Sequence, residues 1–172
     1  RYGYDTKDRL LSVQDPISLT TTYTYDGLGN LTQLGSPDTG VATYVPDAAG
    51  NVVGATDARG MAISHVYDAL NRQTLATFAG GSVALEYDSA ATGGAFASGR
   101  LTRVTDPSGS TTYAYDAWGR VLRKTQAVGS DASTRSFAVS YQHAAGRMTG
   151  ITYPSGRVSS YAFDAQGRVT GV

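Results

Sequence analysis

The acidic side chains are the residues through which this chain could do acid–base chemistry. Its 172 residues include thirteen aspartates, a single glutamate (Glu86) and two histidines, His65 and His143. A pair of carboxylates, or a carboxylate beside an imidazole, can act as a general acid and base. Most of the aspartates, however, occupy periodic positions, whereas an active site occurs once. We therefore predict that they have a structural role.

Other common catalytic and ligand-binding patterns are missing from the sequence. The chain has no cysteine, which excludes thiolate nucleophiles, thiolate metal sites and disulfides. His65 and His143 show no HExxH or clustered spacing, so we expect packed or surface histidines. No serine lies in a G-x-S-x-G segment, and the glycines lack phosphate-loop spacing. We therefore predict no catalytic residue, no cofactor and no metal, and we do not expect an enzyme.

The aspartates belong to a repeat that extends over residues 1–172. Its first three steps are 21 residues each, and the later ones are 20 to 28 residues. This spacing predicts a single array of about eight repeats, cut from a larger protein. The copies are YGYDTKDRL (2–10), YTYDGLGNL (23–31), YVPDAAGNV (44–52), HVYDALNRQ (65–73), LEYDSA (85–90), YAYDAWGRV (113–121), SYQHAAGRM (140–148) and YAFDAQGRV (161–169).

Each copy is typical of a β-hairpin. Tyr113 and Tyr115 are two residues apart, so they point to the same face of a strand. Asp116 can accept backbone N–H groups at the start of a type I turn, and Gly119 tolerates a positive φ at a bulge. A second turn, such as TDPSGS at 105–110, closes the unit. We predict an all-β fold, an antiparallel hairpin array of roughly sixteen strands.

The residues assigned to the repeat motif share these strand-end and turn positions. They are Tyr2, Tyr4, Asp5, Tyr23, Tyr25, Asp26, Gly29, Asp47, Gly50, Tyr67, Asp68, Tyr87, Asp88, Gly99, Arg100, Tyr113, Tyr115, Asp116, Gly119, Arg120, Tyr141, Gly146, Arg147, Tyr161, Phe163, Asp164, Gly167 and Arg168.

Three copies are irregular. Pro46 replaces the second aromatic residue and predicts a bulge or a break in pairing. Residues 89–98 form an insertion before Gly99. The seventh copy has Tyr141 in the second aromatic position, followed by one extra residue before Gly146. After the turn, Leu101 and Val104 are three residues apart, which requires either a bulge or cover on both faces.

The pattern Tyr-x-Tyr-Asp-x-x-Gly-Arg, alternating with Asp-Pro-x-Gly turns, resembles the YD repeat of the RHS (rearrangement hotspot) family. This family includes bacterial polymorphic toxins, the B and C components of insecticidal toxin complexes, and teneurins. The resemblance covers essentially the whole chain and implies a curved or spiralling β-sheet ribbon, here an arc of an RHS shell. It further implies a non-catalytic wall that encapsulates or displays a C-terminal toxin.

The resemblance also suggests partners and location. We expect contacts with neighbouring repeats of the parent chain and with an encapsulated toxin polypeptide, and secretion or delivery from a bacterium. Fourteen basic and fourteen acidic side chains cancel, which argues against nucleic acid. No apolar run is long enough for a membrane span, and the first residues have no signal-peptide character. Exposed sheet edges suggest edge-to-edge self-association.

Two groups of side chains at the turns could bind ligands. Arg100, Arg120, Arg147 and Arg168 follow the turn glycines, and we favour their pairing with turn aspartates across hairpins over anion binding. We expect Trp118 to be exposed, so it could stack on a sugar. A carbohydrate- or cell-surface-binding module is therefore the alternative function.

Overall fold

The structure is a computed structural model that describes residues 1–129 and 133–172. It contains seventeen strands and one short helix. The elements are β1 (Tyr2–Tyr4), β2 (Leu10–Gln14), β3 (Thr20–Tyr25), β4 (Leu31–Ser36), β5 (Gly40–Pro46), β6 (Val52–Thr56), β7 (Ala62–Tyr67), β8 (Gln73–Phe78), β9 (Gly81–Tyr87), α1 (Ala90–Gly93), β10 (Leu101–Asp106), β11 (Gly109–Tyr115), β12 (Val121–Val128), β13 (Arg135–Ala144), β14 (Arg147–Thr152), β15 (Val158–Ser160), β16 (Ala162–Phe163) and β17 (Val169–Gly171).

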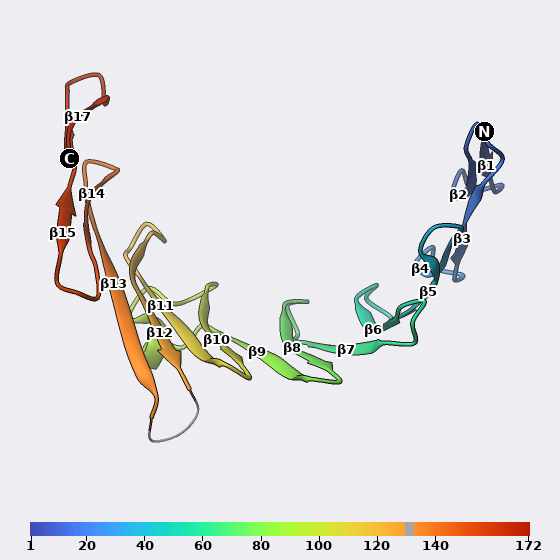
Figure 1. Cartoon of the computed structure of the whole chain (residues 1–172), viewed down its shortest axis with the longest axis horizontal. Coiled ribbons are helices and arrows are strands. Elements are labelled where there is room, and N and C mark those ends of the chain that lie inside the picture. Colours follow the sequence, from blue (N-terminus) through green and yellow to red (C-terminus); the bar gives the residue numbers. More distant parts are fainter. Residues whose placement is uncertain (130–132) are drawn as a thin grey trace. The chain divides into compact units, whose positions relative to one another are not determined.

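The strands follow one another in chain order, so the predicted antiparallel hairpin array is confirmed (Figure 1). Strands β1 to β15 form one sheet, and β16 and β17 form a separate pair. The chain divides into two compact units, Arg1–Ser82 and Val83–Val172. Each unit is built from hairpins, because strands rich in Thr, Tyr and Val alternate with turns rich in Asp and Gly.

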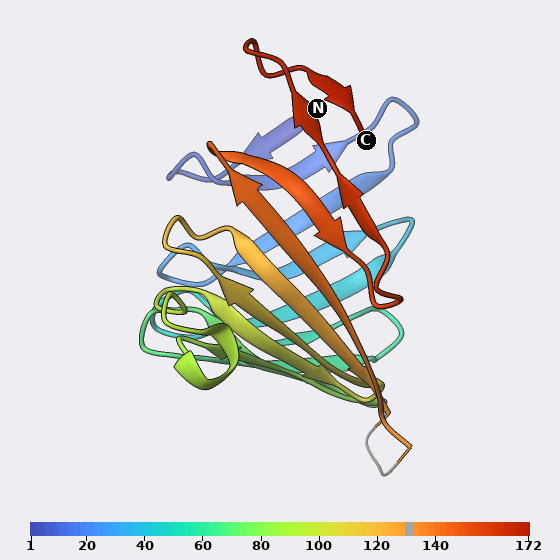
Figure 2. The ribbon, with the colours of Figure 1, turned by 90° about the vertical axis from the view of Figure 1, so that its left-hand side faces the viewer.

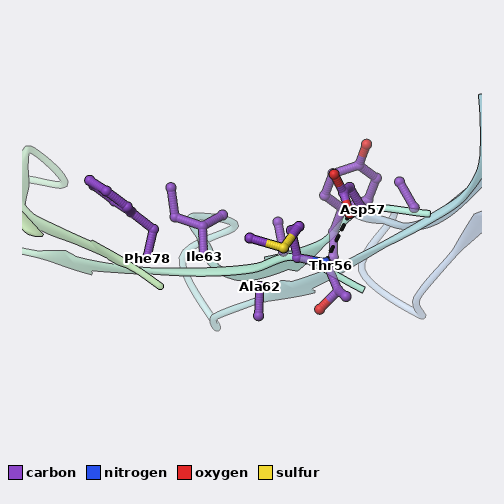
Figure 3. Close-up of a pocket in the computed structure, with 9 residues that line it drawn as sticks. Thr56, Asp57, Ala62, Ile63 and Phe78 are labelled. Atoms are coloured by element: carbon purple, nitrogen blue, oxygen red, sulfur yellow. Dashed lines mark hydrogen bonds between the residues drawn. The ribbon is translucent and has the colours of Figure 1, made fainter. Parts of the chain in front are cut away.

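The sheet has two chemically different faces. Residues directly opposite one another in an antiparallel ladder share a face. In the first unit, Ile63 lies opposite Ala55 and Phe78, and Ala55 lies opposite Tyr44. Figure 3 shows Ile63 and Phe78 on one side of the sheet and Ala62 on the other. We call the side that carries the tyrosines, Ile63 and Phe78 the aromatic face.

The opposite face is rich in small and hydroxyl side chains. In the first unit its opposed pairs include Thr22 with Gly35, Thr43 with Thr56, and Ser64 with Thr77. We call this side the hydroxyl face. The alternation follows from the period of two along each strand, which places Tyr and Thr on opposite sides.

The sheet is a single layer without an extensive core. Among the described residues, Ala76 and Ala97 are the only buried hydrophobic ones. The accessible surface is 10955 Å², whereas a compact globular protein of this mass exposes about 8,000 Å². The side chains of the aromatic face are therefore covered mainly by one another, and most of them are only half-buried.

A bulge occurs at the same point of each hairpin that carries the motif. The pairing register shifts just before Tyr4, Tyr25, Pro46, Tyr67, Tyr115, His143 and Phe163. The bulge expected from Pro46 is thus present, and it belongs to the general pattern. In the β9–β10 hairpin the shift lies between Leu101 and Arg103.

This last bulge settles the question of Leu101 and Val104. Leu101 lies opposite Tyr87, and Val104 lies opposite Leu85. Since Tyr87 and Leu85 are two residues apart, the bulge at Thr102 brings Leu101 and Val104 onto the same face.

The seventh copy differs from its expected register. The shift before His143 shows that His143, not Tyr141, occupies the second aromatic position. The following turn lacks the aspartate and is one residue shorter than in the other copies, rather than longer. Ala145 and Gly146 form it with positive φ values of 49° and 78°.

The insertion in the fifth copy leaves its hairpin intact. Residues 89–98 contain α1, which projects beside the end of β9 and β10 as the yellow-green coil in Figure 2. Asp88 still donates its N–H to the carbonyl of Arg100 at 3.0 Å.

Candidate functional site

The most regular feature of the structure is the turn that begins at the aspartate of the motif, here called the Asp turn. In the sixth copy, Asp116 Oδ1 accepts the backbone N–H groups of Trp118 and Arg120, both at 2.9 Å. Asp116 Oδ2 accepts the Nε–H of Arg120 at 2.6 Å. Gly119 has φ +81° and donates its N–H to the Asp116 carbonyl. Both carboxylate oxygens therefore hold the turn.

The other Asp turns repeat this geometry with small substitutions. Arg9, Arg72 and Arg168 bind the aspartate of their own turn at 2.6 or 2.7 Å. In the second and third copies, Asn30 and Asn51 bind the aspartate through their side-chain amides. Of the four arginines predicted to pair with turn aspartates across hairpins, Arg120 and Arg168 instead pair with the aspartate of their own turn.

These hydrogen bonds favour the ionised carboxylate. At Asp164, the N–H of Arg168 and then its guanidinium hold the pKa below the ordinary value of 3.8. At Asp116, burial opposes the shift, but the hydrogen bonds from Arg120 still lower the pKa. The pKa is also lowered at Asp5, Asp26, Asp47 and Asp68. Such a carboxyl is a poor proton donor near neutral pH.

The second tyrosine of a copy ties that copy to the preceding one. Its hydroxyl donates to the backbone carbonyl of the residue that follows the preceding turn. The pairs are Tyr25 with Leu10 at 3.0 Å, Tyr67 with Val52 at 3.1 Å, and Tyr115 with Leu101 at 2.6 Å. Pro46 and Phe163 have no hydroxyl, so these copies cannot form the link.

Turn arginines make a second link between copies. Arg9 donates to the carbonyl of Asp26 at 3.1 Å, and its Cζ lies 5.0 Å from the centre of the Tyr25 ring. Arg100 and Arg147 lie 5.7 Å from the next aromatic ring, that of Tyr115 and of Phe163. These cations therefore contact their neighbouring repeat, which leaves them poorly placed to form an anion-binding row.

One recurring contact was not predicted from the sequence. A threonine at the bulge donates its hydroxyl to the carbonyl between the two aromatic positions. The pairs are Thr32 with Thr24 at 3.1 Å, Thr74 with Val66 at 3.2 Å, and Thr102 with Glu86 at 3.0 Å. The sequence feature that could have predicted this hydrogen bond is a threonine two residues after the Arg or Asn of the turn.

The aromatic face contains shallow apolar hollows. In the first unit, one of about 310 Å³ is lined by Ala42 and Ala55, which are small, and by Tyr44, Ile63 and Phe78. Figure 3 shows the side chains of Ile63 and Phe78 rising from the same side of the sheet. Asp57 at its rim is bound by Arg59 at 2.7 Å. The hollow therefore suits an apolar group.

The second unit places a cation among its aromatic residues. Lys124 lies opposite Tyr113 and Val139 on the aromatic face. One hollow of about 280 Å³ is lined by Tyr113, Val121, Lys124, Tyr141 and His143. The next residue, Arg123, pairs with Ala114 and therefore points to the hydroxyl face.

Trp118 is 79% exposed, which confirms the expectation for its side chain. The Cζ of Arg120 lies 4.9 Å from the centre of its ring. A hollow of about 510 Å³ is lined by Trp118, Arg120, His143 and residues 144–146. This arrangement offers the indole ring of Trp118 beside one guanidinium and one imidazole group.

The two histidines lie apart from any acid cluster. His65 and His143 both belong to the aromatic face, and the Nδ1 atom of each is buried without a hydrogen-bond partner. Across the described residues, no three His, Cys, Asp or Glu side chains are close enough to hold a metal ion. None of the helices in the described part of the chain has the length and apolarity to cross a membrane.

Comparison with known families agrees with this geometry. The family model described as RHS Repeat matches residues 4–41, 47–83, 97–134 and 143–172, which is most of the chain. The chain belongs to the RHS repeat family. A search among characterised protein sequences gave no significant match.

Solved structures of Tc toxin complexes share the fold of this RHS repeat chain. The crystal structure of TcdB2-TccC3 has a TM-score of 0.80 at 18% identity, and that of TcdB2-TccC3-TEV has a TM-score of 0.79 at 18% identity. The Photorhabdus luminescens Tc holotoxin pore with a substituted TccC3 gives 0.78, again at 18% identity. In each case the match covers 98% of this chain and 10% of the other, so the RHS repeat chain spans a tenth of their length.

Proposed function

We propose that this RHS repeat chain is a segment of a shell wall that encapsulates or displays a toxin polypeptide. The observation that carries the proposal is the single-layer sheet with one aromatic face and one hydroxyl face. An apolar face of this extent needs to be covered by other sheet, another chain or cargo. The fold shared with Tc toxin complexes supports a wall in a secreted or delivered assembly.

On this proposal, residues 1–172 are one array within a larger bacterial protein. The tyrosine and arginine links join successive repeats, as a continuous wall requires. The neighbouring repeats of the parent chain and the enclosed polypeptide are then its partners. The outer strands of the sheet, β1 and β15, are where further repeats would pair.

Photo-crosslinking tests which face contacts polypeptide. Because the chain has no cysteine, Ala42→Cys on the aromatic face and Thr43→Cys on the hydroxyl face each carry one benzophenone-maleimide. The probe is reduced, carboxymethylated α-lactalbumin, which stays unfolded. Crosslinks from Ala42→Cys alone support the wall. Equal crosslinking from both positions, or none, overturns the proposal.

We also propose that the chain is not itself an enzyme. The carboxylates of the Asp turns are bound within their turns, and the pKa of each is lowered where a shift is resolved. A panel of esterase, glycosidase and peptidase substrates tests this directly. A reproducible activity that His143→Ala or His65→Ala abolishes would refute it.

Trp118 supports a second candidate, a carbohydrate- or cell-surface-binding module. Its exposed ring, beside Arg120 and a hollow, could stack on a sugar. Glycan-array binding that Trp118→Ala removes would favour this candidate. Leu70→Ala is the matched control, because Leu70 has the same place in its Asp turn and is 71% exposed. No signal, or equal loss in both variants, eliminates it.

A further inference from the structure

Lys124 is a cation on the aromatic face whose charge has no partner there. It lies opposite Tyr113 and Val139, and its side chain is half-buried. Within residues 1–129 and 133–172, no ion pair or hydrogen bond involves its ammonium group. By contrast, Arg103 on the hydroxyl face approaches Glu86 at 4.0 Å.

Two hollows flank Lys124. The first, of about 280 Å³, is the one that includes Tyr113 and His143. The second, of about 310 Å³, is lined by Lys124, Gln126, Phe137, Val139, Tyr141 and Pro154. Since Lys124 and Tyr141 line both, these two side chains form the ridge that separates an aromatic hollow from an aliphatic and aromatic one.

A half-buried ammonium surrounded by apolar groups attracts a carboxylate. The attraction grows when a docked chain displaces water, because the local dielectric constant falls. The charge-assisted hydrogen bond that forms is stronger than a neutral one. The apolar hollows on either side favour uncharged, bulky side chains at the flanking positions.

We propose that this part of the aromatic face binds an extended polypeptide segment in which an Asp or Glu lies between two apolar side chains. In an extended segment, alternate side chains point the same way. In an apolar-x-acidic-x-apolar pattern, the two apolar side chains would therefore enter the two hollows, and the acidic side chain would reach Lys124 on the ridge between them. The inference rests on the proposed function, since it specifies the chemistry of the polypeptide that the wall contacts.

A second copy of this chain is a poorer occupant. Among the described strands of that copy, Asp106 at the end of β10 is the one acid on the aromatic face. Asp57 is bound by Arg59 and Asp106 by Ser108, each within its own turn, and Glu86 lies on the hydroxyl face. Charge complementarity therefore favours a foreign acidic segment.

Fluorescence polarisation with the 172-residue chain tests the inference. The probes are two rhodamine-labelled, amidated peptides, Phe-Ser-Asp-Ser-Leu and Phe-Ser-Asn-Ser-Leu. At low ionic strength we expect the Asp peptide to bind about threefold more tightly, the scale of one partly exposed ion pair. Lys124→Gln removes this preference. Arg123→Gln, the neighbouring cation on the hydroxyl face, retains it.

Several results would overturn the inference. Equal affinity of the two peptides, or a preference that persists in Lys124→Gln or disappears in both variants, excludes a role for Lys124. Self-association that Lys124→Gln abolishes assigns the surface to a second copy. Binding of neither peptide contradicts the proposed function as well, whereas equal binding contradicts this inference alone. If circular dichroism shows Lys124→Gln unfolded, Lys124→Met replaces it.

Discussion

At the scale of single residues, the aspartate of six Asp turns accepts hydrogen bonds through both carboxylate oxygens. In the copy of Asp164, Oδ1 accepts the N–H groups of Gln166 and Arg168, and Oδ2 accepts the guanidinium. An Asn at this position could reproduce the first set of bonds but not the ion pair. The negative charge of the aspartate therefore contributes to holding the turn together.

These carboxylates predict a loss of stability in acid. Since folding lowers their pKa from the ordinary 3.8, their contribution is present above that value and is lost as the pH falls through the lower folded value. We expect the melting temperature to be nearly constant from about pH 7 to about pH 5 and to fall below about pH 4. Circular dichroism at a series of pH values measures it. A melting temperature that rises on acidification contradicts the assignment.

The tyrosine link between copies gives a second prediction. Tyr115→Phe removes the hydroxyl that donates to Leu101 at 2.6 Å, so we expect a loss of about 0.5–1.5 kcal/mol in the free energy of unfolding. Urea denaturation measures this loss. Tyr113→Phe is the control, because the described residues include no hydrogen-bond partner for the Tyr113 hydroxyl, and it should cost less. Equal effects would show that the link adds no stability.

At the scale of the hairpin, the third residue after the aspartate must adopt a positive φ. Gly119 has φ +81°, and an added Cβ would lie 2.7 Å from the Arg100 guanidinium. Asn71 and Asp8 occupy the same turn position with φ values of 58° and 59°. This agrees with the tolerance of Asn and Asp for the left-handed region.

Substitution at this position should depend on the new side chain. We expect Gly119→Ala to cost about 1–2 kcal/mol in unfolding free energy, and Gly119→Asn to cost less. Gly27→Ala is the control, because Gly27 has open space around it and its φ is not positive. Thermal and urea unfolding compare the three variants. Equal losses for Gly119→Ala and Gly27→Ala would contradict the role of the left-handed turn.

Sequence periodicity predicted the hairpins and Asp turns because those features depend on neighbouring residues. It predicted a bulge at single positions such as Pro46, but not the register shift that recurs in the motif hairpins, since such a shift depends on how two strands pair. His143 illustrates this, because its position became clear only from the shift between Gln142 and His143. The Lys124 ridge could not be predicted from the sequence either, because it depends on which side chains of β11, β12 and β13 point to the same face of the sheet.

At the scale of the whole molecule, each repeat depends on its neighbours in the sequence. The chain separates into the units Arg1–Ser82 and Val83–Val172. In repeat proteins, stability is a sum of repeat and nearest-neighbour terms. We therefore expect residues 1–82 and 83–172, expressed separately, each to keep their strand signal in circular dichroism.

A matched truncation tests this modularity. Residues 1–70 end inside the Asp turn of Asp68 and lose β8, so this shorter piece should melt at a lower temperature than residues 1–82. Melting curves of the two pieces give the comparison. If residues 1–82 were unfolded while the whole chain was folded, stability would have to be cooperative across the two units.

The loop at residues 89–98 shows that one hairpin end accepts ten residues where the regular Asp turns have two. The Asp88 N–H still donates to the Arg100 carbonyl at 3.0 Å, as in the regular turns, and Gly99 donates its N–H to Asp88 Oδ1. The loop is thus an insertion that the hairpin tolerates without losing its closing hydrogen bond. An epitope tag or a small reporter peptide exchanged for these residues should be displayed at the rim of the sheet while the strand ladder stays in register.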